Sequence, residues 1–291
     1  MSPQSFFAPA KLNLFLHVIG RRADGYHLLE SVFQLLDFGD TLEIVVRGDG
    51  SLRRSVDLPD VAVEDDLVMR AAHLLKRHGG TVLGADLALT KRIPIGGGLG
   101  GGSSDAATTL LALNRLWGLD LPRSELARLA LELGADVPFF IFGRNAFARG
   151  IGEDLVQVEL PQRWYVVLVP PCSVPTAAIF RSPDLTRNAK SVKIEDFPAS
   201  AWSFPAMEFR NDLEPVVCAE FAPVARVLGW LHDFDAGALC AARMSGSGAC
   251  VFAAFGSHEQ AQAVLAQKPA DCEGFVASAL SRHPLLDFAR D

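Results

Sequence analysis

A glycine-rich segment in the N-terminal half of the chain has the composition of an anion-binding loop. Its members and the two serines after it are Gly96, Gly97, Gly98, Leu99, Gly100, Gly101, Gly102, Ser103 and Ser104. So many glycines cost conformational entropy on folding, which a protein tolerates where its backbone must approach a ligand closely. A strand is expected before the loop and a helix after it, capped by Ser103 or Ser104, and free N–H groups at a helix N-terminus bind anions. The loop therefore predicts a phosphate site; a flexible surface turn is the alternative.

Two familiar nucleotide-binding patterns overlap this loop, and neither fits its surroundings. A G-x-G-x-x-G pattern begins at Gly96, and Asp120 stands about twenty residues further on, where the dinucleotide fingerprint requires an acidic residue. That residue should end a second parallel strand, whereas Asp120 lies in a turn after a predicted helix. The pattern that begins at Gly97 resembles a Walker A loop but lacks its lysine. The sequence therefore favours neither of these two sites.

A lysine and an aspartate are candidates for chemistry beside the phosphate. The run of residues 10–18 alternates with period two and predicts a strand, with Lys11 and Asn13 on one face. An ammonium with apolar neighbours is costly unless it has a partner. Asp136 follows Gly134, the expected C′ residue of a helix, and precedes a Val-Pro pair, so a short stiff loop holds it. We expect Lys11 to pair with Asp136; the alternatives are a water-facing lysine and an aspartate that caps the next element.

An aromatic pair follows a glycine turn near the N-terminus. Tyr26 and His27 come directly after Arg22–Gly25, a turn sequence that should expose both side chains. A flat aromatic face beside a polar ring suits recognition of a nucleobase. Phe180, taken alone, would be a core residue, and Phe33 is expected to pack beside the pocket.

The composition excludes several classes of protein. The net charge is −7 and no Lys/Arg cluster exceeds short runs such as Arg53-Arg54, so no nucleic acid is expected as a partner. No apolar run approaches the roughly 18 residues of a membrane span, and the N-terminus lacks a signal-peptide pattern. Five cysteines without a C-x-x-C pair indicate a reduced, cytoplasmic protein without a structural metal. Nothing requires a large obligate interface, so a monomer or weak homodimer is expected.

Periodicity and turn residues predict an α+β chain in two domains. The predicted strands cover residues 10–18, 28–36, 40–46, 85–90, 157–169 and 248–255, and the predicted helices cover 66–76, 103–117, 124–133, 215–231 and 259–267. Pro170, Pro171 and Pro175 interrupt the pattern after the fifth strand. We place the boundary close to this point, which gives domains of residues 1–160 and 161–291 with a site between them.

Three motifs together resemble the GHMP kinase superfamily of small-molecule kinases. They are Pro9–Leu14, the glycine loop with its serines, and Met244–Ala249, in that order across about 240 residues. The resemblance implies a ribosomal-S5-domain-2-like N-terminal domain and a ferredoxin-like C-terminal domain. It also implies ATP with Mg²⁺ as the phosphoryl donor, while the Mg²⁺ ligands stay open.

Further stretches are similar to one branch of that superfamily, over nearly the whole chain. They are Ala8–Leu14, Arg22–His27, Gly96–Ser104, Gly134–Phe139 and Arg243–Ala249. Members of this branch phosphorylate the 2-hydroxyl of 4-diphosphocytidyl-2-C-methyl-D-erythritol (CDP-methylerythritol) in the non-mevalonate isoprenoid pathway. A kinase for homoserine, a mevalonate derivative or another small alcohol is the first alternative. A non-catalytic binding protein of the same fold is the second, although such a protein should have lost Lys11 or Asp136.

The resemblance also implies a role for each candidate residue. Asp136 is the expected base for the substrate hydroxyl, and Lys11 is the expected cation that stabilises charge on the reacting oxygen. Tyr26 and Phe180 are expected to stack on opposite faces of the cytosine, with His27 at its polar edge. The implied catalytic residues are therefore Lys11 and Asp136, and the implied substrate-binding residues are Asn13, Tyr26, His27, Phe33 and Phe180.

Two acidic residues depart from the superfamily pattern on the nucleotide side. Asp66 stands where the branch commonly has asparagine, so a carboxylate that only accepts hydrogen bonds replaces an amide that would contact adenine. Asp105 stands where asparagine is often found, and it adds negative charge that suits a helix N-terminus or a metal. Lys91 is expected to point toward the nucleotide or to be a solvated strand end. Asp66 and Lys91 complete the implied nucleotide-binding set.

Overall fold

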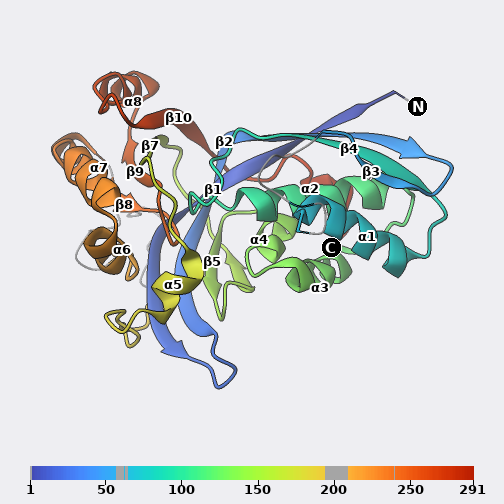
Figure 1. Cartoon of the computed structure of the whole chain (residues 1–291), viewed down its shortest axis with the longest axis horizontal. Helices are drawn as coiled ribbons and strands as arrows, with labels where there is room; N and C mark the ends of the chain where they lie inside the picture. The colour runs from blue at the N-terminus through green and yellow to red at the C-terminus, as the bar shows by residue number, and fades with distance from the viewer. Residues whose placement is uncertain (1, 57–61, 63–64, 194–208, 239) are drawn as a thin grey trace.

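Two long antiparallel strands connect the two halves of the protein (Figure 1). They are β1 (Gln4–Arg21) and β2 (His27–Arg47) in a computed structural model that describes residues 2–56, 62, 65–193, 209–238 and 240–291. The sequence predicted two strands in place of β2, but the strand continues through Gly39. A Cβ at Gly39 would lie 2.2 Å from the carbonyl oxygen of Ala8, so the missing side chain permits close pairing with β1 there.

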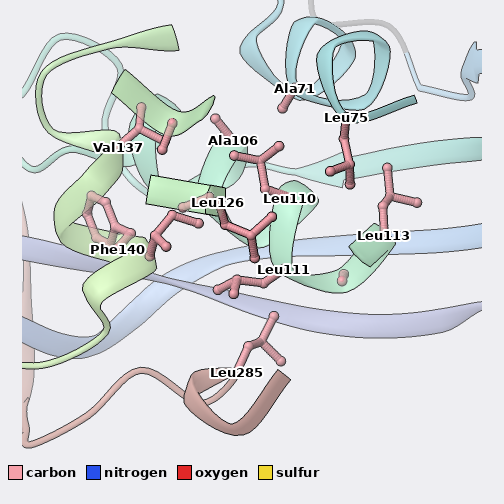
Figure 2. Close-up of a cluster of buried hydrophobic side chains, with 14 of the residues drawn as sticks. Ala71, Leu75, Ala106, Leu110, Leu111, Leu113, Leu126, Val137, Phe140 and Leu285 are labelled. Carbon is pink, nitrogen blue, oxygen red and sulfur yellow. The ribbon is translucent and has the colours of Figure 1, made fainter. Parts of the chain in front are cut away.

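The N-terminal half packs helices against this sheet (Figure 1). Its remaining elements are β3 (Leu52–Arg54), α1 (Leu67–Gly79), β4 (Gly84–Thr90), α2 (Gly101–Leu116), α3 (Arg123–Leu133), α4 (Val137–Phe142), β5 (Ala146–Arg149) and β6 (Asp154–Gln157). Figure 2 shows Leu110 and Leu111 of α2 among apolar side chains from α1, α3 and α4. The three helices predicted in this half are confirmed within a few residues. The sequence missed α4, because a six-residue apolar run is too short to display helical periodicity.

The C-terminal half forms a four-stranded antiparallel sheet with helices packed on it. Its elements are β7 (Trp164–Val169), α5 (Thr176–Arg181), α6 (Glu214–Glu220), α7 (Ala222–His232), β8 (Cys240–Met244), β9 (Val251–Phe255), α8 (His258–Leu265) and β10 (Glu273–Leu280), with short 3₁₀ turns at Asp235–Gly237 and Leu286–Phe288. The strand order is β10-β7-β9-β8. With β7 and β8, and β9 and β10, joined through helices, this is the ferredoxin-like arrangement that the resemblance implies.

Prolines divide two elements that the sequence predicted as continuous. The predicted strand 157–169 is β6 followed by β7, with Pro161 between them. The predicted helix 215–231 is α6 followed by α7, with Phe221 extended at φ −123° and ψ 86°. Pro223, in the first turn of α7, accounts for this break, because proline has no N–H to continue the preceding helix and its ring clashes with the carbonyl four residues earlier.

The two halves are joined by main-chain pairing. β10 pairs with β7 along most of its length and then with β2, where Ala279 and Leu280 lie opposite Leu36 and Leu35. The chain then returns to the N-terminal half, where Leu285 enters the core shown in Figure 2. The division at residues 160/161 stays a prediction. Within the described residues, no helix is both long and apolar enough to cross a membrane.

Leu111→Ala should destabilise the N-terminal half substantially. The Leu111 side chain is fully buried in the α2 core, and removal of a buried leucine costs about 2–5 kcal/mol through lost burial and the cavity that it leaves. Urea unfolding followed by circular dichroism measures the change. Leu131→Ala in α3 is the matched control: its side chain is 43% exposed, so a change within about 0.5 kcal/mol is expected. Equal losses in the two variants would contradict this assignment of the core.

Candidate active site

A cavity of about 740 Å³ opens where β1, the glycine loop and α5 meet. Residues that are far apart in the chain line it together, including the turn after β1, the residues before α4, and the third predicted motif. The predicted catalytic and substrate-side residues that line it are Lys11, Asn13, Tyr26, His27, Phe33, Asp136 and Phe180. The structure thus brings that whole set to one cavity.

β1 places the Lys11 ammonium inside this cavity. Lys11 Nζ lies 3.3 Å from Asp136 Oδ2 and donates a hydrogen bond of 2.5 Å to Asn13 Oδ1. Its side chain is only 4% exposed, whereas that of Asp136 is 34% exposed. The ammonium also lies 5.2 Å from the centre of the Phe33 ring, within the range of a cation–π contact. These contacts compensate the buried charge, so Lys11 is not a water-facing edge lysine.

Asp136 immediately precedes α4, but its side chain makes no hydrogen bond that caps the helix. The capping alternative from the sequence is therefore not realised. Its carboxylate is the more exposed member of the pair with Lys11 and faces the space that a ligand can enter. An ionised carboxylate in that position can accept a proton from a bound hydroxyl.

Asn13 connects the Lys11 ammonium to the surrounding strands. Its Nδ2 donates to Ser31 Oγ at 2.8 Å, and Ser31 Oγ donates to the carbonyl oxygen of Phe15 at 2.6 Å. Its backbone N–H donates to Ser245 Oγ in the third motif. With its Nδ2 committed to Ser31, the amide is fixed with Oδ1 toward Lys11.

The glycine loop enters α2 earlier than the serines suggested. α2 begins at Gly101, with Gly100 as the N-cap residue in the left-handed region at φ 71°. Ser104 N already donates to the Gly100 carbonyl, so Ser103 and Ser104 lie in the first turn of the helix. The prediction that one of them is the N-cap is wrong, because glycine can take the left-handed conformation that ends the loop. Ser103 lines the cavity, whereas Ser104 is fully buried.

The loop is held from both halves of the protein. Lys11 N in β1 donates to the Leu99 carbonyl oxygen, and Cys250 N donates to the Gly97 carbonyl oxygen. Ser245 Oγ donates to the carbonyl oxygen of Gly98 at 3.0 Å. A Cβ at Gly98 would lie 2.1 Å from the Ser245 carbonyl oxygen, and φ there is +74°. Close approach and backbone conformation therefore both require glycine at this position.

Three rings line the far part of the cavity. Tyr26 is 59% exposed, while His27 and Phe180 lie against each other with ring centres 5.1 Å apart and planes inclined by 31°. Phe180 is therefore not simply a core residue. The stacking of Tyr26 and Phe180 on opposite faces of a base stays a prediction, since the direct ring contact is between Phe180 and His27.

Arg187 holds the imidazole of His27. Its Nε donates to His27 Nε2 at 3.1 Å. Burial of the ring is the main cause that lowers the pKa of His27, and the positive charges of Arg187 and Arg21 lower it further. His27 is therefore neutral at neutral pH, and because Nε2 accepts a hydrogen bond, its proton is on Nδ1.

A second cavity, of about 350 Å³, shares Gly96, Gly98, Gly100 and Ser103 with the first. The remaining members of the predicted nucleotide-binding set that line it are Asp66, Lys91, Gly97, Leu99, Gly101 and Gly102. Ser104 lines neither cavity. The glycine loop thus borders two spaces, one beside the Lys11–Asp136 pair and one beside α1.

Two of the nucleotide-side residues have structural partners. Asp66 Oδ1 accepts a hydrogen bond from Val68 N and caps α1, and its other oxygen lies 3.5 Å from Arg54 Nη1. The Lys91 ammonium lies between Asp40 and Asp105, 2.5 Å from the first carboxylate and 2.7 Å from the second. Lys91 is therefore not a solvated strand end, and its charge is shared with two carboxylates.

The Asp40–Lys91–Asp105 cluster is buried, and its two carboxylates have different hydrogen-bond partners. Burial alone would lower the pKa of Lys91, but the charges of Asp105 and Asp40 raise it. Burial of the carboxyl raises the pKa of Asp105 to about 7, against the opposing effect of Lys91. Asp40 also accepts hydrogen bonds from the backbone N–H groups of Arg92 and Ile93, whereas Asp105 Oδ1 makes no hydrogen bond. Asp105 therefore holds a proton more readily than an ordinary aspartate does.

Sequence reasoning missed several residues that position this site. Asn211 Nδ2 donates to the carbonyl oxygens of Met244 and Gly246 and so supports the third motif. Arg187 and Asp40 are the others described above. An Asn-Asp pair before a predicted helix signals a cap at most. Arg187 lies in no motif or periodic segment, and Asp40 is only the first residue of a predicted strand, which does not indicate a role in the site.

Gly98→Ala should weaken nucleotide binding by about tenfold or more, because the added methyl group must displace the Ser245 carbonyl and reshape the loop. Isothermal calorimetry with a non-hydrolysable ATP analogue measures the affinity. Gly229→Ala is the control, since Gly229 lies within α7 and the added carbon would meet no atom within 4 Å apart from its chain neighbours and the adjacent backbone of its own helix. The control should bind as tightly as wild type. Normal affinity in Gly98→Ala would show that the close approach is not required.

Asp105→Asn should remove a pH dependence of stability. Because its pKa is raised, the folded protein keeps a proton that the unfolded chain loses between about pH 4 and pH 7, so the free energy of unfolding falls as pH rises through that window. The variant should lose less stability there than wild type, by roughly 1 kcal/mol or more. Urea unfolding at pH 5 and pH 8 measures the difference. Asp154→Asn, an exposed carboxylate in β6, should follow wild type, and identical profiles for all three proteins would sink this assignment.

Comparisons with known proteins agree with this architecture. The model for the GHMP kinases N terminal domain matches residues 66–144, and the model for the GHMP kinases C terminal matches residues 201–273. A 4-diphosphocytidyl-2-C-methyl-D-erythritol kinase from Burkholderia multivorans is 57% identical, over 99% of this chain and 98% of that protein. The relative of the same name from Burkholderia thailandensis is 58% identical, over 97% of this chain and 96% of that protein.

Solved structures extend the comparison. A crystal structure of 4-(cytidine 5'-diphospho)-2C-methyl-D-erythritol kinase matches with a TM-score of 0.75 at 35% identity, over 95% of this chain and 99% of that chain. The homoserine kinase of Cytophaga hutchinsonii matches with a TM-score of 0.73 at 19% identity, over 97% and 96% of the two chains, and so shares the fold. With more than half of its residues identical over nearly its whole length, the chain belongs to the 4-diphosphocytidyl-2-C-methyl-D-erythritol kinases, a branch of the GHMP kinases.

Proposed function

We propose that the protein transfers the γ-phosphoryl group of ATP to the 2-hydroxyl of CDP-methylerythritol, a step in the synthesis of isoprenoid precursors. One observation carries this assignment: the glycine loop separates two cavities, and the Lys11–Asp136 pair faces only the larger one. A phosphoryl donor bound in one cavity and an alcohol acceptor bound in the other would meet at the loop. Family membership supports the choice of both substrates.

The larger cavity suits the cytidine diphosphate substrate. Tyr26, His27 and Phe180 offer flat faces and a hydrogen-bonding ring for a base. They line the same cavity as the Lys11–Asp136 pair. The smaller cavity suits ATP, because the N–H groups at the start of α2 and the positive end of its dipole favour phosphate. Gly96, Gly98, Gly100 and Ser103 border both spaces, so the reacting phosphoryl group belongs beside them.

Proton transfer and charge stabilisation follow from the Lys11–Asp136 pair. The substrate hydroxyl oxygen forms a bond to the γ-phosphorus while the bond to the β–γ bridging oxygen breaks, and ADP leaves with that oxygen. Asp136 accepts the hydroxyl proton. The Lys11 ammonium, held by Asn13, stabilises negative charge on the reacting oxygens.

Mg²⁺ is part of the proposal as the companion of ATP. The ion usually binds through nucleotide phosphates, water and only one or two protein oxygens. The described residues contain no group of three His, Cys, Asp or Glu side chains that could hold a metal, which fits an ion carried by phosphates. Ser103, which lines both cavities, is the candidate protein ligand. When bound, the ion neutralises charge on the β- and γ-phosphates.

Location and assembly are proposed from the sequence. All five cysteines are free thiols, which suits a reducing, cytoplasmic compartment. A monomer or weak homodimer is proposed, and sedimentation tests it.

Asp136→Asn should lower kcat by about two to four orders of magnitude, because the amide cannot accept the hydroxyl proton. ADP release from ATP with CDP-methylerythritol and Mg²⁺ measures turnover. Asp154→Asn removes a carboxylate from the surface and should keep wild-type turnover. A wild-type protein that turns over another alcohol but not CDP-methylerythritol would overturn the substrate. Full turnover in Asp136→Asn would overturn the base.

A further inference from the structure

Arg187 lies on the segment after α5 and connects two walls of the larger cavity. Its Nη2 donates to the carbonyl oxygens of Phe180 and Ser182, at 3.1 and 2.7 Å, and its Nη1 donates to the carbonyl oxygen of Leu185. Its Nε donates to His27 Nε2 on the other wall, at the start of β2. One guanidinium therefore donates to carbonyls at the end of α5 and also fixes a ring of β2.

The bond to His27 determines where that imidazole carries its proton. Arginine can only donate, so His27 Nε2 must accept, and the single proton of the neutral ring is confined to Nδ1. Without this bond, the two neutral tautomers would compete. The contact with the Phe180 ring further restricts the orientation of the imidazole. His27 therefore offers one defined N–H donor to the cavity that it lines.

A fixed donor distinguishes pyrimidines by their edges. The N3 atom of cytosine is an acceptor, whereas N3 of uracil carries a hydrogen and is a donor. An N–H group of His27 can donate a hydrogen bond to N3 of cytosine, whereas it would face another donor at N3 of uracil. A site built to make a hydrogen bond rejects an analogue that leaves the buried group unpaired.

We propose that Arg187 is a positioning residue that gives the site its preference for cytosine over uracil, by locking His27 in the Nδ1–H tautomer and holding Phe180 against it. This inference rests on the proposed function, in which the base of CDP-methylerythritol occupies the cavity beside His27. Arg187 acts through His27 and Phe180 and has no part in phosphoryl transfer.

Arg187→Met tests the proposal, because methionine keeps the length of the side chain but donates no hydrogen bond. KM for CDP-methylerythritol should rise about tenfold while kcat stays within about twofold, as expected for lost binding rather than lost chemistry. The preference for CDP-methylerythritol over its uridine counterpart, measured as a ratio of kcat/KM, should fall about tenfold or more. Arg226→Met removes a surface arginine paired with Asp271 and should change neither value.

The tautomer is observable directly. ¹⁵N NMR of histidine-labelled wild type should show His27 protonated on Nδ1, and Arg187→Met should show the proton shared with Nε2. Arg187→Lys, whose ammonium can still donate to His27, should recover part of the selectivity even if Arg187→Met folds poorly. If Arg187→Met keeps the wild-type selectivity and the wild-type His27 tautomer, the inference about Arg187 is overturned but the proposed function is not. Failure of wild type to use CDP-methylerythritol would instead overturn the proposed function.

Discussion

The geometry of the site depends on a loop backbone held by hydrogen bonds from two directions. β1 donates to Leu99, and Cys250 and Ser245, in the connection between β8 and β9, donate to Gly97 and Gly98. Neither half of the chain alone can fix the loop, since each supplies only one side of these contacts. The separation of 147 residues between Ser245 and Gly98 shows how far apart in sequence the two sides are. Folding of both halves therefore precedes a working phosphate site.

The buried ammonium of Lys11 is the second constraint. A strand positions a side chain more rigidly than a loop does, and β1 is covered on both faces. That coverage would make the charge unfavourable without Asn13, Asp136 and the Phe33 ring. The same contacts orient the charge toward the space that a substrate hydroxyl would occupy. Stability and chemistry thus impose the same arrangement on these residues.

The sequence predicted the parts of the site that lie in local motifs. The surroundings of Lys11 called for a partner, and the family resemblance favoured Asp136; the glycine loop was expected before a helix. The structure contains both features. Arg187 could not be predicted, because its contact with His27 spans 160 residues and follows no periodic pattern. The start of α2 was misjudged because local propensity favours serine caps, whereas Gly100 takes a conformation that only the loop context requires.

The fold shows the same division between local and distant information. Long amphipathic helices were found from periodicity, and strands β8 and β10 were missed. Their positions are set by pairing with β9, β7 and β2, which no local pattern encodes. The prolines explain why two predicted elements are divided. A proline in the sequence does not, however, show where the next helix or strand begins.

The pairing of β10 with both β7 and β2 has a consequence for motion. A shared strand couples the two halves through main-chain hydrogen bonds, so they cannot hinge apart as independent bodies without breaking backbone pairing. Domain closure on the microsecond to millisecond scale is therefore not favoured as the way ligands enter this part of the molecule. The exposed ring of Tyr26 at the cavity can instead rotate within nanoseconds. Access of a ligand to the pocket would then depend on side-chain rotation, such as that of Tyr26, rather than on movement of the two halves.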